Sequence, residues 1–244
     1  MLEVDGLRKA FGGVHAVDGV SFALARAEIR ALIGPNGAGK TTLFNMLTGQ
    51  LSADAGRVTL GGEAISGLPP HAIARRGVGR TFQITATFGS LSALENVQVA
   101  RFAHTGGSRG VTRPARGLEI RASMALLEQV GLAAAVDRPS AVLAYGDLKK
   151  LELAVALASE PRVLLLDEPT AGMAPTDRQA LMALVQAIAR ARGLTVLFTE
   201  HDMDVVFQVA DRITVLHQGR VIADGAPAAV RADAEVQRVY LGEL

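Results

Sequence analysis

The sequence predicts an α/β protein with a parallel sheet at its core and an inserted helical region. Three observations support this prediction. Extended and helical stretches alternate in the last third of the chain, one early extended run ends in a glycine-rich loop, and the middle changes to helical periodicity. Hydrophobic residues make up 49% of the 244 residues and charged residues 20%, a composition typical of a chain that buries a substantial core.

The first third contains short extended runs that end at turns. They predict strands at residues 2–7, 17–24, 29–33 and 78–82. The third run, IRALI, leads directly into the glycine-rich loop, and a helix is expected from about Lys40 to Gly49. Residues 57–65 place Gly61 and Gly62 between two extended stretches, which predicts a hairpin.

The middle of the chain, from about Leu91 to Ala158, has apolar residues at helical spacing. These residues are Leu94, Val97, Val99, Leu126, Leu127, Val130 and Leu132. Within this region, residues 104–116 are rich in glycine and arginine and show no periodicity, which predicts an exposed loop. Two interpretations of this loop stay open: a solvated connection, or a contact with a partner or lipid head groups.

After Pro161, strands and helices alternate as in a parallel sheet with crossover connections. The expected strands are residues 163–167, 194–200, 212–219 and 220–225, with a helix at about 176–192, a short helix, and a terminal helix.

Charge and composition exclude several classes of protein. The chain has 25 Lys and Arg against 24 Asp and Glu, a net charge of +1, so no global charge attracts nucleic acid or an anionic membrane. There is no cysteine, which excludes disulfides and thiol chemistry. No apolar run reaches the roughly 18 residues of a membrane span, and the start lacks the pattern of a secretory signal. A cytoplasmic location is therefore expected.

The glycine-rich loop matches the phosphate-binding pattern G-x-x-x-x-G-K-[ST], between a predicted strand and a predicted helix. It consists of Gly34, Pro35, Asn36, Gly37, Ala38, Gly39, Lys40 and Thr41. Its backbone N–H groups and the helix N-terminus are expected to bind a triphosphate, with Lys40 at the β- and γ-phosphates, Thr41 on Mg²⁺ and Thr42 at the α-phosphate. An ordinary glycine turn would not explain the lysine and threonine in register with the helix.

The second motif is acidic. Residues 163–166 predict a buried strand, and Asp167 and Glu168 stand at its end. A phosphate loop needs a carboxylate on a neighbouring strand to hold Mg²⁺, and Asp167 fits that position. Glu168 is expected to act as general base on the water that attacks the γ-phosphate. Without the phosphate loop, the pair would be interpreted as a helix cap or a solvated turn.

Together with the motifs below, these residues make the chain resemble the ATP-binding subunits of ABC transporters over essentially its whole length. The resemblance implies a P-loop NTPase (RecA-like) core, residues 1–90 and 160–244, with an antiparallel β subdomain. It also implies an inserted helical subdomain at about residues 91–159. The implied activity is hydrolysis of ATP, with Mg²⁺ as the metal.

The resemblance assigns further roles. Gln83, in the run RTFQ, matches the family's Q-loop glutamine, which binds Mg²⁺ or the attacking water. His201, in Thr199-Glu200-His201-Asp202, matches the switch histidine, which contacts the γ-phosphate and orients Glu168. Phe11 matches the aromatic residue that stacks on adenine, although a lone phenylalanine is ordinarily part of the core.

Two family motifs depart from their usual sequence. The signature LSGGQ reads Leu143-Ala144-Tyr145-Gly146-Asp147, so a hydroxyl donor is missing. Tyr145, Gly146 and the helix N-terminus are expected to contact the γ-phosphate held by an opposite subunit. Asp147 would repel that phosphate unless it turns away to cap the helix. The D-loop reads 171–174, AGMA, without the family's aspartate.

These departures, FGG near the start and the tail YLGEL resemble the ATPases of bacterial branched-chain amino acid importers. The resemblance implies a homodimer, or a heterodimer with a paralogous ATPase, at the cytoplasmic face of the cell membrane. It also implies integral membrane permeases, one of which would contact residues 83–91, and indirectly an external substrate-binding protein. That stretch is otherwise a simple linker.

Two other functions fit the sequence less well. One is an ABC ATPase that acts on nucleic acid or ribosomes, which the near-zero net charge and the lack of long coiled coils disfavour, so no nucleic-acid partner is expected. The other is a GTPase or small-molecule kinase, which leaves Gln83, Gly146 and His201 unexplained.

Overall fold

The computed structural model describes residues 1–81, 87–105 and 119–240, and within them the strands form two sheets. The larger sheet has the order β10-β9-β3-β8-β7-β6 and the smaller has the order β2-β1-β4-β5. The larger sheet comprises β10 (Arg220–Gly225), β9 (Arg212–His217), β3 (Ile29–Ile33), β8 (Thr195–Thr199), β7 (Val163–Asp167) and β6 (Val78–Arg80). The smaller comprises β2 (Val14–Leu24), β1 (Leu2–Phe11), β4 (Ala55–Leu60) and β5 (Glu63–Ala64).

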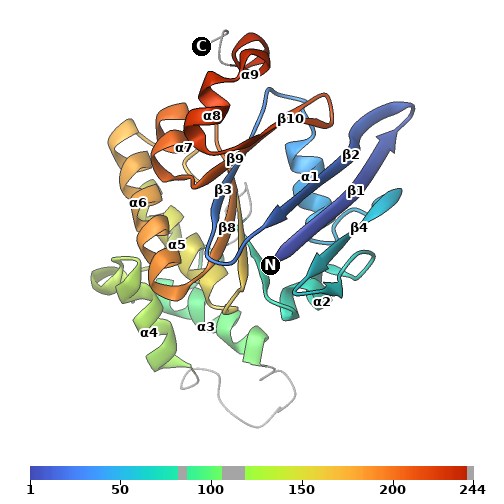
Figure 1. The fold of residues 1–244 in the computed structure, drawn as a ribbon. Coiled ribbons are helices and arrows are strands. Elements are labelled where there is room, and N and C mark those ends of the chain that lie inside the picture. The colour runs from blue at the N-terminus through green and yellow to red at the C-terminus, as the bar shows by residue number, and fades with distance from the viewer. Residues whose placement is uncertain (82–86, 106–118, 241–244) are drawn as a thin grey trace.

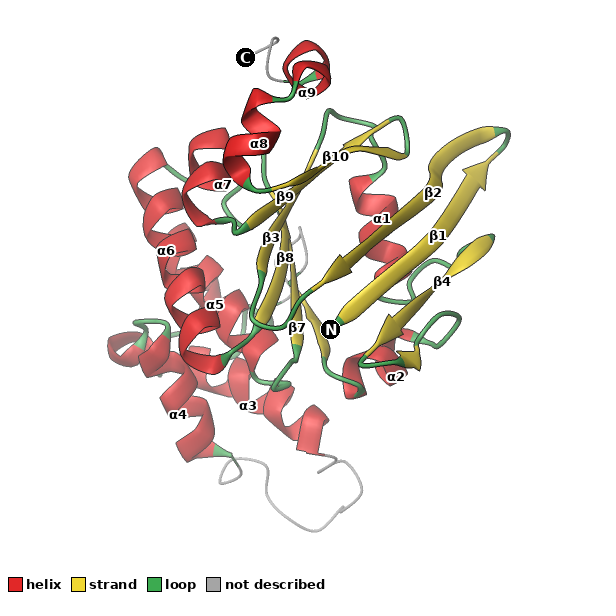
Figure 2. Ribbon diagram, in the orientation of Figure 1, coloured by secondary structure: helices red, strands yellow, loops and turns green. Residues whose placement is uncertain are grey.

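Helices cover the larger sheet on both faces (Figures 1 and 2). They are α1 (Lys40–Leu47), α2 (Pro70–Arg75), α3 (Ala93–Thr105), α4 (Ile120–Gln129), α5 (Tyr145–Leu157), α6 (Pro175–Arg192), α7 (Met203–Val209), α8 (Pro227–Ala232) and α9 (Ala234–Val239). Two 3₁₀ turns, η3 (Ala133–Ala135) and η4 (Ser140–Val142), lie between α4 and α5. Figure 1 shows α5, α6 and α7 on one side of the larger sheet, and α1 with the smaller sheet on the other.

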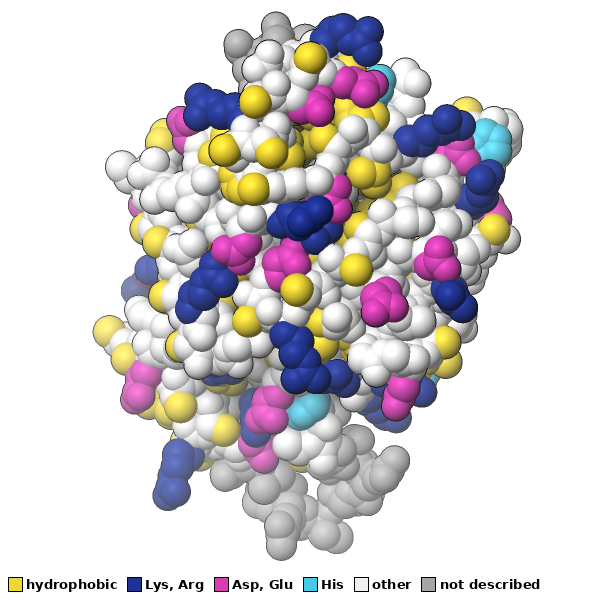
Figure 3. All heavy atoms as spheres, in the orientation of Figure 1, with side chains coloured by type: hydrophobic (Ala, Val, Ile, Leu, Met, Phe, Trp, Pro, Cys, Tyr) yellow, Lys and Arg dark blue, Asp and Glu magenta, His cyan; other side chains and the backbone are white. Residues whose placement is uncertain are grey.

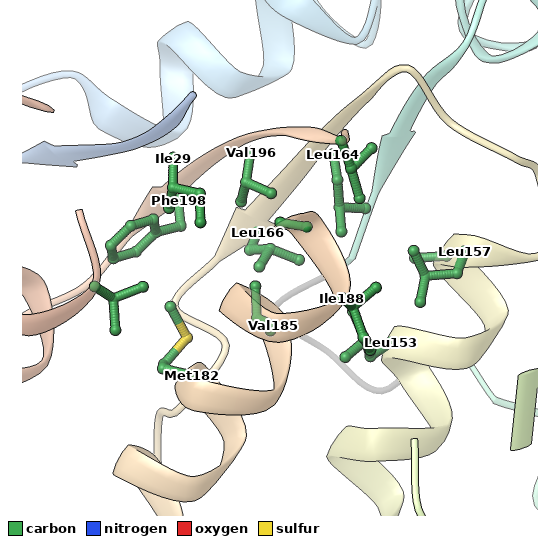
Figure 4. Packing of buried hydrophobic residues seen from close by; sticks show 14 of the residues in the cluster. Ile29, Leu153, Leu157, Leu164, Leu166, Met182, Val185, Ile188, Val196 and Phe198 are labelled. Atoms are coloured by element: carbon green, nitrogen blue, oxygen red, sulfur yellow. The ribbon is translucent and has the colours of Figure 1, made fainter. Parts of the chain in front are cut away.

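The central strands β3, β7 and β8 are buried at every residue, as expected of short apolar runs between two layers. Because successive side chains point to opposite faces, each strand contributes to two cores. On one face, Leu164, Leu166 and Phe198 pack with α5 and α6 (Figure 4). On the other face, Leu165 and Leu197 pack in a cluster with α1 and the smaller sheet.

The order of the larger sheet corrects one expectation from the sequence. The strand that ends in Asp167 is not adjacent to the strand that precedes the phosphate loop, because β8 lies between them and pairs in parallel with both. The intervening strand places Thr199, its last residue, directly opposite Asp167. The residues that follow β8 therefore lie between the phosphate loop and the acidic motif.

The last strand also differs from the expected parallel pattern, since β10 pairs antiparallel with β9. Gln218 and Gly219 connect the two strands, and both have positive φ, 47° and 77°. Two successive residues with positive φ form the type I′ turn that joins antiparallel neighbours. The expected terminal helix is two short helices, α8 and α9. The strand expected at residues 78–82 ends at Arg80 in the structure, and residue 82 lies outside the described residues.

Helices α3 and α4 lie below the larger sheet in the view of Figure 1. Ala93, Val97 and Leu127 of this region belong to the same buried cluster as Leu164 and Leu166 of β7. The helices therefore pack on the sheet without a separate core, and their division into a subdomain at about residues 91–159 stays a prediction.

Charged side chains of both signs are interspersed on the face in Figure 3. Arg212, for example, donates a hydrogen bond to Asp224 at 2.7 Å. None of the helices that the described residues form has the length and apolarity needed to cross a membrane.

Candidate active site

The glycine-rich loop connects the end of β3 to the start of α1, as predicted. Gly39 occupies the N-cap position of α1 and offers no side chain to the helix N-terminus. The first backbone N–H groups of a helix have no intrahelical partner, and together with the helix dipole they favour an anion. Thr41 is exposed at this end of α1 and Thr42 is half-buried.

Close backbone packing fixes the shape of the loop. A Cβ atom at Gly34 would lie 2.0 Å from the carbonyl oxygen of Leu216, and one at Gly39 would lie 2.2 Å from that of Ala16. These positions therefore require glycine for the fold itself. The contacts wedge the loop between β9 and β2, so its backbone is held in place by other strands.

Lys40 is buried beneath the loop, with 7% of its surface exposed. Its Nζ donates hydrogen bonds to the carbonyl oxygens of Gly34 at 2.6 Å and Pro35 at 3.1 Å. Burial lowers the pKa of Lys40, and the carboxylates of Glu168 and Asp167 act in the opposite direction. The ammonium group is thus held inside the loop that the motif predicts to bind phosphates.

Asp167 lies at the end of β7 and is 3% exposed. Its Oδ1 accepts a hydrogen bond from Thr199 Oγ1 at 2.9 Å, and its Oδ2 accepts one from Arg80 Nη2 at 2.8 Å. Thr199 Oγ1 also accepts a hydrogen bond from the backbone N–H of Glu168 at 3.0 Å. Thr199 therefore joins the ends of β7 and β8 through the Asp167 carboxylate and the Glu168 backbone.

Glu168 and His201 meet at the edge of the sheet, as the resemblance implies. Glu168 Oε1 lies 3.0 Å from His201 Nε2, and their side chains are 22% and 46% exposed. Glu168 has a φ of 48°, a left-handed conformation that is strained for a residue with a side chain. This conformation turns its carboxylate away from the direction of the strand, toward the histidine and the solvent.

Glu200 belongs to this site and was missed in the sequence, where only His201 was singled out. It is 4% exposed, and its Oε1 accepts hydrogen bonds from the backbone N–H and the hydroxyl of Thr170, at 2.8 and 2.7 Å. Burial raises the pKa of Glu200, although the bonds from Thr170 lower it. Glu200 thereby ties the turn after β7 to the turn after β8. The position of this glutamate, directly before His201, was the available signal.

Tyr240 is a second residue that the sequence analysis did not place in the site. Its pKa is raised by burial, while a hydrogen bond with the backbone of Gly34 lowers it and nearby Glu200 raises it. The end of α9 therefore lies against the first residue of the phosphate loop. In the sequence, Tyr240 was noted only as part of the tail YLGEL.

Phe11 and Tyr145, two further predicted residues, are exposed and have contacts outside this cluster. Phe11 ends β1 and is 50% exposed, with Lys9 Nζ 5.7 Å from its ring centroid. Tyr145 is 47% exposed at the start of α5, and its hydroxyl donates a hydrogen bond to the carbonyl of Ala171 at 2.8 Å. Gln83 and most of residues 104–116 lie outside the described residues.

Asp147 does not cap α5, because Ala144 occupies the N-cap position without a side-chain hydrogen bond. Instead, Asp147 Oδ1 accepts a hydrogen bond from Lys150 Nζ at 2.9 Å. This ion pair partly offsets the negative charge of the carboxylate near the N-terminus of α5.

The oxygen donors of the site suit Mg²⁺. Among the described residues, no group of three or more His, Cys, Asp or Glu side chains is arranged to hold a metal ion. Asp167 and Thr41 offer one carboxylate and one exposed hydroxyl, and Mg²⁺ is commonly held by one or two such groups together with substrate phosphates and water. The donor set therefore fits a metal that binds together with a nucleotide.

The phosphate loop lies between a parallel strand and a helix, and an acidic pair and a histidine follow two neighbouring strands. This combination defines a P-loop nucleoside triphosphatase. The chain belongs to the ABC transporter family of ATP-binding proteins: the family model described as ABC transporter matches residues 17–171. A second model, described as branched-chain amino acid ATP-binding cassette transporter, matches residues 220–243.

Curated relatives agree with this assignment over their full length. The chain is 42% identical to the high-affinity branched-chain amino acid transport ATP-binding protein BraF of Pseudomonas aeruginosa, covering 100% of this chain and 98% of the relative. It is 40% identical to LivG of Escherichia coli, with the same coverage. A solved ATP-binding cassette of an ABC transporter in its ADP conformation has a TM-score of 0.89 and 31% identity, covering 99% of this chain and 98% of that one. These findings confirm the predicted family and fold class.

Proposed function

We propose that this chain is the ATP-hydrolysing motor subunit of an importer for branched-chain or related amino acids. The main structural observation is the 3.0 Å contact between Glu168 and His201, which follow β7 and β8 beside the strand that precedes the phosphate loop. The match of residues 220–243 to the branched-chain amino acid family supports the class of cargo. The cargo itself would contact the permeases and an external substrate-binding protein.

The phosphate-loop half of the site is proposed to bind ATP. Backbone N–H groups of Gly34 to Thr42 would surround the phosphates, and the buried Lys40 would exchange its loop carbonyls for β- and γ-phosphate oxygens. Thr41, Asp167 and Gln83 would hold Mg²⁺, which neutralises charge that develops on the phosphates. Phe11, with its exposed ring, would stack on adenine.

Hydrolysis is assigned to Glu168 and His201. Glu168 would accept a proton from the attacking water, because its side chain is partly open to solvent and its carboxylate contacts His201. His201 would fix the orientation of that carboxylate and donate to a γ-phosphate oxygen. Both side chains come from turns that Glu200 and Thr170 tie together, so the pair is positioned before a nucleotide binds.

A second chain is proposed to complete the site. The residues at the start of α5, Ala144 and Tyr145, are exposed, so this helix N-terminus faces away from the chain's own core. In a homodimer or a heterodimer with a paralogous ATPase, Tyr145 and Gly146 of one chain would approach the γ-phosphate bound by the other. ATP would then favour the closed dimer, and hydrolysis would release it.

The permease contact is proposed at a cavity of about 430 Å³. The cavity lies between β6, α2 and α5, and its lining includes Ile73, Val78, Arg80, Val155 and Thr87. Thr87 also belongs to residues 83–91, the stretch expected to contact a permease, so the cavity includes part of that stretch. A permease segment here would place the chain at the cytoplasmic face of the membrane, as a peripheral subunit.

The test is purification of the tagged chain from gently solubilised membranes of its host, followed by mass spectrometry and an ATPase assay. We expect two apolar permeases, with or without a second ATPase, and ATP turnover that Glu168→Gln abolishes. Glu128→Gln, a change at an exposed glutamate of α4, is the matched control and should retain turnover. Recovery of ribosomes or other soluble proteins without permeases would contradict the proposal.

A further inference from the structure

Arg80 makes an unusually large set of contacts for the last residue of a short strand. Its Nη2 donates to Asp167 Oδ2 at 2.8 Å, and its Nη1 donates to Asn45 Oδ1 at 2.7 Å. Nη1 also lies 3.2 Å from Thr48 Oγ1 and 3.2 Å from Gln50 Oε1. The guanidinium group therefore connects the end of β7 with the C-terminal end of α1 and the residues that follow it.

The ion pair between Arg80 and Asp167 is buried, because the two side chains are 8% and 3% exposed. A buried carboxylate without a partner is costly, and the arginine compensates its charge permanently, since a guanidinium does not lose its proton in proteins. The carboxylate also accepts from Thr199 at Oδ1. Because a carboxylate has about four lone-pair positions, both oxygens can still accept one further ligand each.

Two positive charges close to one carboxylate repel each other, and the repulsion is strong where water is excluded. In the nucleotide-free chain, a divalent cation at Asp167 would meet the positive charge of Arg80 without any phosphate to offset it. With a nucleotide in the phosphate loop, the phosphate oxygens supply the missing negative charge. The position of Arg80 thus bears directly on when the cation binds.

We propose that Arg80 is a positioning residue that holds Asp167 charge-compensated and makes divalent-cation binding at Asp167 depend on the nucleotide. The inference rests on the proposed role of Asp167 as a Mg²⁺ ligand. Arg80 and two of its acceptors, Thr48 and Gln50, also line the 430 Å³ cavity. A segment docked in that cavity therefore contacts the side chain that compensates the metal ligand.

The experiment is titration of the nucleotide-free full chain with Mn²⁺, followed by electron paramagnetic resonance of the free ion. Arg80→Gln removes the charge and should tighten Mn²⁺ binding at least tenfold relative to the wild type. Arg80→Lys retains the charge and should stay close to the wild type. Asp167→Asn added to Arg80→Gln should abolish the gain, which would locate the bound ion at Asp167.

If Arg80→Gln is folded but too unstable for a long titration, thermal unfolding with and without Mg²⁺ still tests it, and Asn45→Ala tests the anchoring of the guanidinium separately from its charge. Asn45→Ala removes one anchor of the guanidinium and leaves its charge, so it should shift Mn²⁺ affinity by less than threefold; a gain as large as that expected of Arg80→Gln would contradict a role for the charge. For Arg80→Gln itself, Mg²⁺ without nucleotide should raise the thermal unfolding midpoint, whereas the wild type should not respond.

Equal Mn²⁺ affinity in Arg80→Gln and wild type, or equal gains in Arg80→Gln and Arg80→Lys, would overturn the inference. Failure of the proposed metal role would look different. In that case, ATP binding by the wild-type chain would be insensitive to Mg²⁺ and to Asp167→Asn. The first failure is measured without nucleotide and the second with it, so the two are distinguishable.

Discussion

The two parts of the predicted ATP site are built in opposite ways within this chain. On the phosphate-loop side, Lys40 and Asp167 are buried and each has hydrogen-bond partners within the chain. On the α5 side, Ala144 and Tyr145 are exposed and the helix N-terminus has no side-chain cap. The difference is consistent with the proposal that the first part binds the nucleotide within one chain, and that the exposed start of α5 contacts the nucleotide of another chain.

Two glycines, Gly39 and Gly146, show the same difference between the two parts of the site. The fold requires Gly39, because a Cβ atom there would overlap the backbone of Ala16 at 2.2 Å. It does not require Gly146, where a Cβ atom would meet only Met173 Cε at 3.8 Å, an ordinary contact. A glycine that the fold of its own chain does not require is consistent with close approach by a ligand, such as a phosphate bound by an opposite subunit.

The largest expected effect is at the hydrolytic pair. Glu168→Gln should lower ATP turnover by about 100- to 10,000-fold, because an amide cannot accept the proton of the attacking water. ATP binding should be retained, since the phosphate loop is untouched. Steady-state phosphate release and equilibrium binding of a fluorescent ATP analogue check both parts, and unchanged turnover would remove Glu168 from the role of base.

The next effect separates the two glycines. Gly39→Ala should cost more than about 3 kcal/mol of unfolding free energy or prevent folding, because it combines backbone overlap with a φ of 103°. Gly146→Ala should be neutral or stabilise the chain by up to about 1 kcal/mol, since alanine is the better helix former. Urea unfolding measures both, and similar costs at the two positions would contradict the contrast.

A smaller effect concerns Glu200. Burial raises the pKa of its carboxyl group above the ordinary value of 4.5. Between that value and the raised pKa, the folded state binds more protons than the unfolded state, so this group makes stability fall as the pH rises. Glu200→Gln removes this dependence and retains an acceptor for Thr170. Its unfolding free energy relative to the wild type should therefore increase as the pH rises above 4.5 and through the raised pKa of Glu200. A constant difference across urea titrations at several pH values would argue against this account.

The smallest expected effect is at the N-cap of α5. Ala144→Ser supplies the hydroxyl that the helix N-terminus lacks and should stabilise the chain by about 1 kcal/mol or less. The same hydroxyl should raise turnover of the assembled complex modestly, by adding a donor for the γ-phosphate. Thermal unfolding and ATPase assays with Ala144→Val as the control, which lacks the hydroxyl, distinguish capping from a change in side-chain size.

Much of the fold could be predicted because it is encoded locally. The runs at residues 29–33 and 163–167 have the bounds of β3 and β7, since short apolar stretches between turns leave little choice of conformation. The insertion of β8 between these two strands could not be predicted, because sheet order depends on contacts between distant parts of the chain. The antiparallel direction of β10 depends on positive φ at both Gln218 and Gly219. Only the glycine signals such a turn in the sequence.

The candidate site was predicted where a motif fixes the backbone. Gly34 to Thr42, Asp167 and Glu168 were predicted from the phosphate-loop pattern and the acidic end of the following buried strand. His201 was predicted from the resemblance to the family, and the structure brings Glu168 and His201 into contact. Arg80 and Glu200 were missed because their significance lies in burial and in partners far along the chain. Arg80 pairs with a carboxylate 87 residues away, and Glu200 with a threonine 30 residues away. Such pairs carry no local pattern.

The most direct test of the central claim compares Gly146→Asp with Lys40→Ala. ATP affinity is measured on the isolated full chain, and turnover is measured in the complex purified from membranes. If α5 acts on the nucleotide of an opposite chain, Gly146→Asp retains the ATP affinity of the wild type and loses turnover, whereas Lys40→Ala loses both. A loss of ATP affinity in isolated Gly146→Asp as large as that in Lys40→Ala would contradict the account.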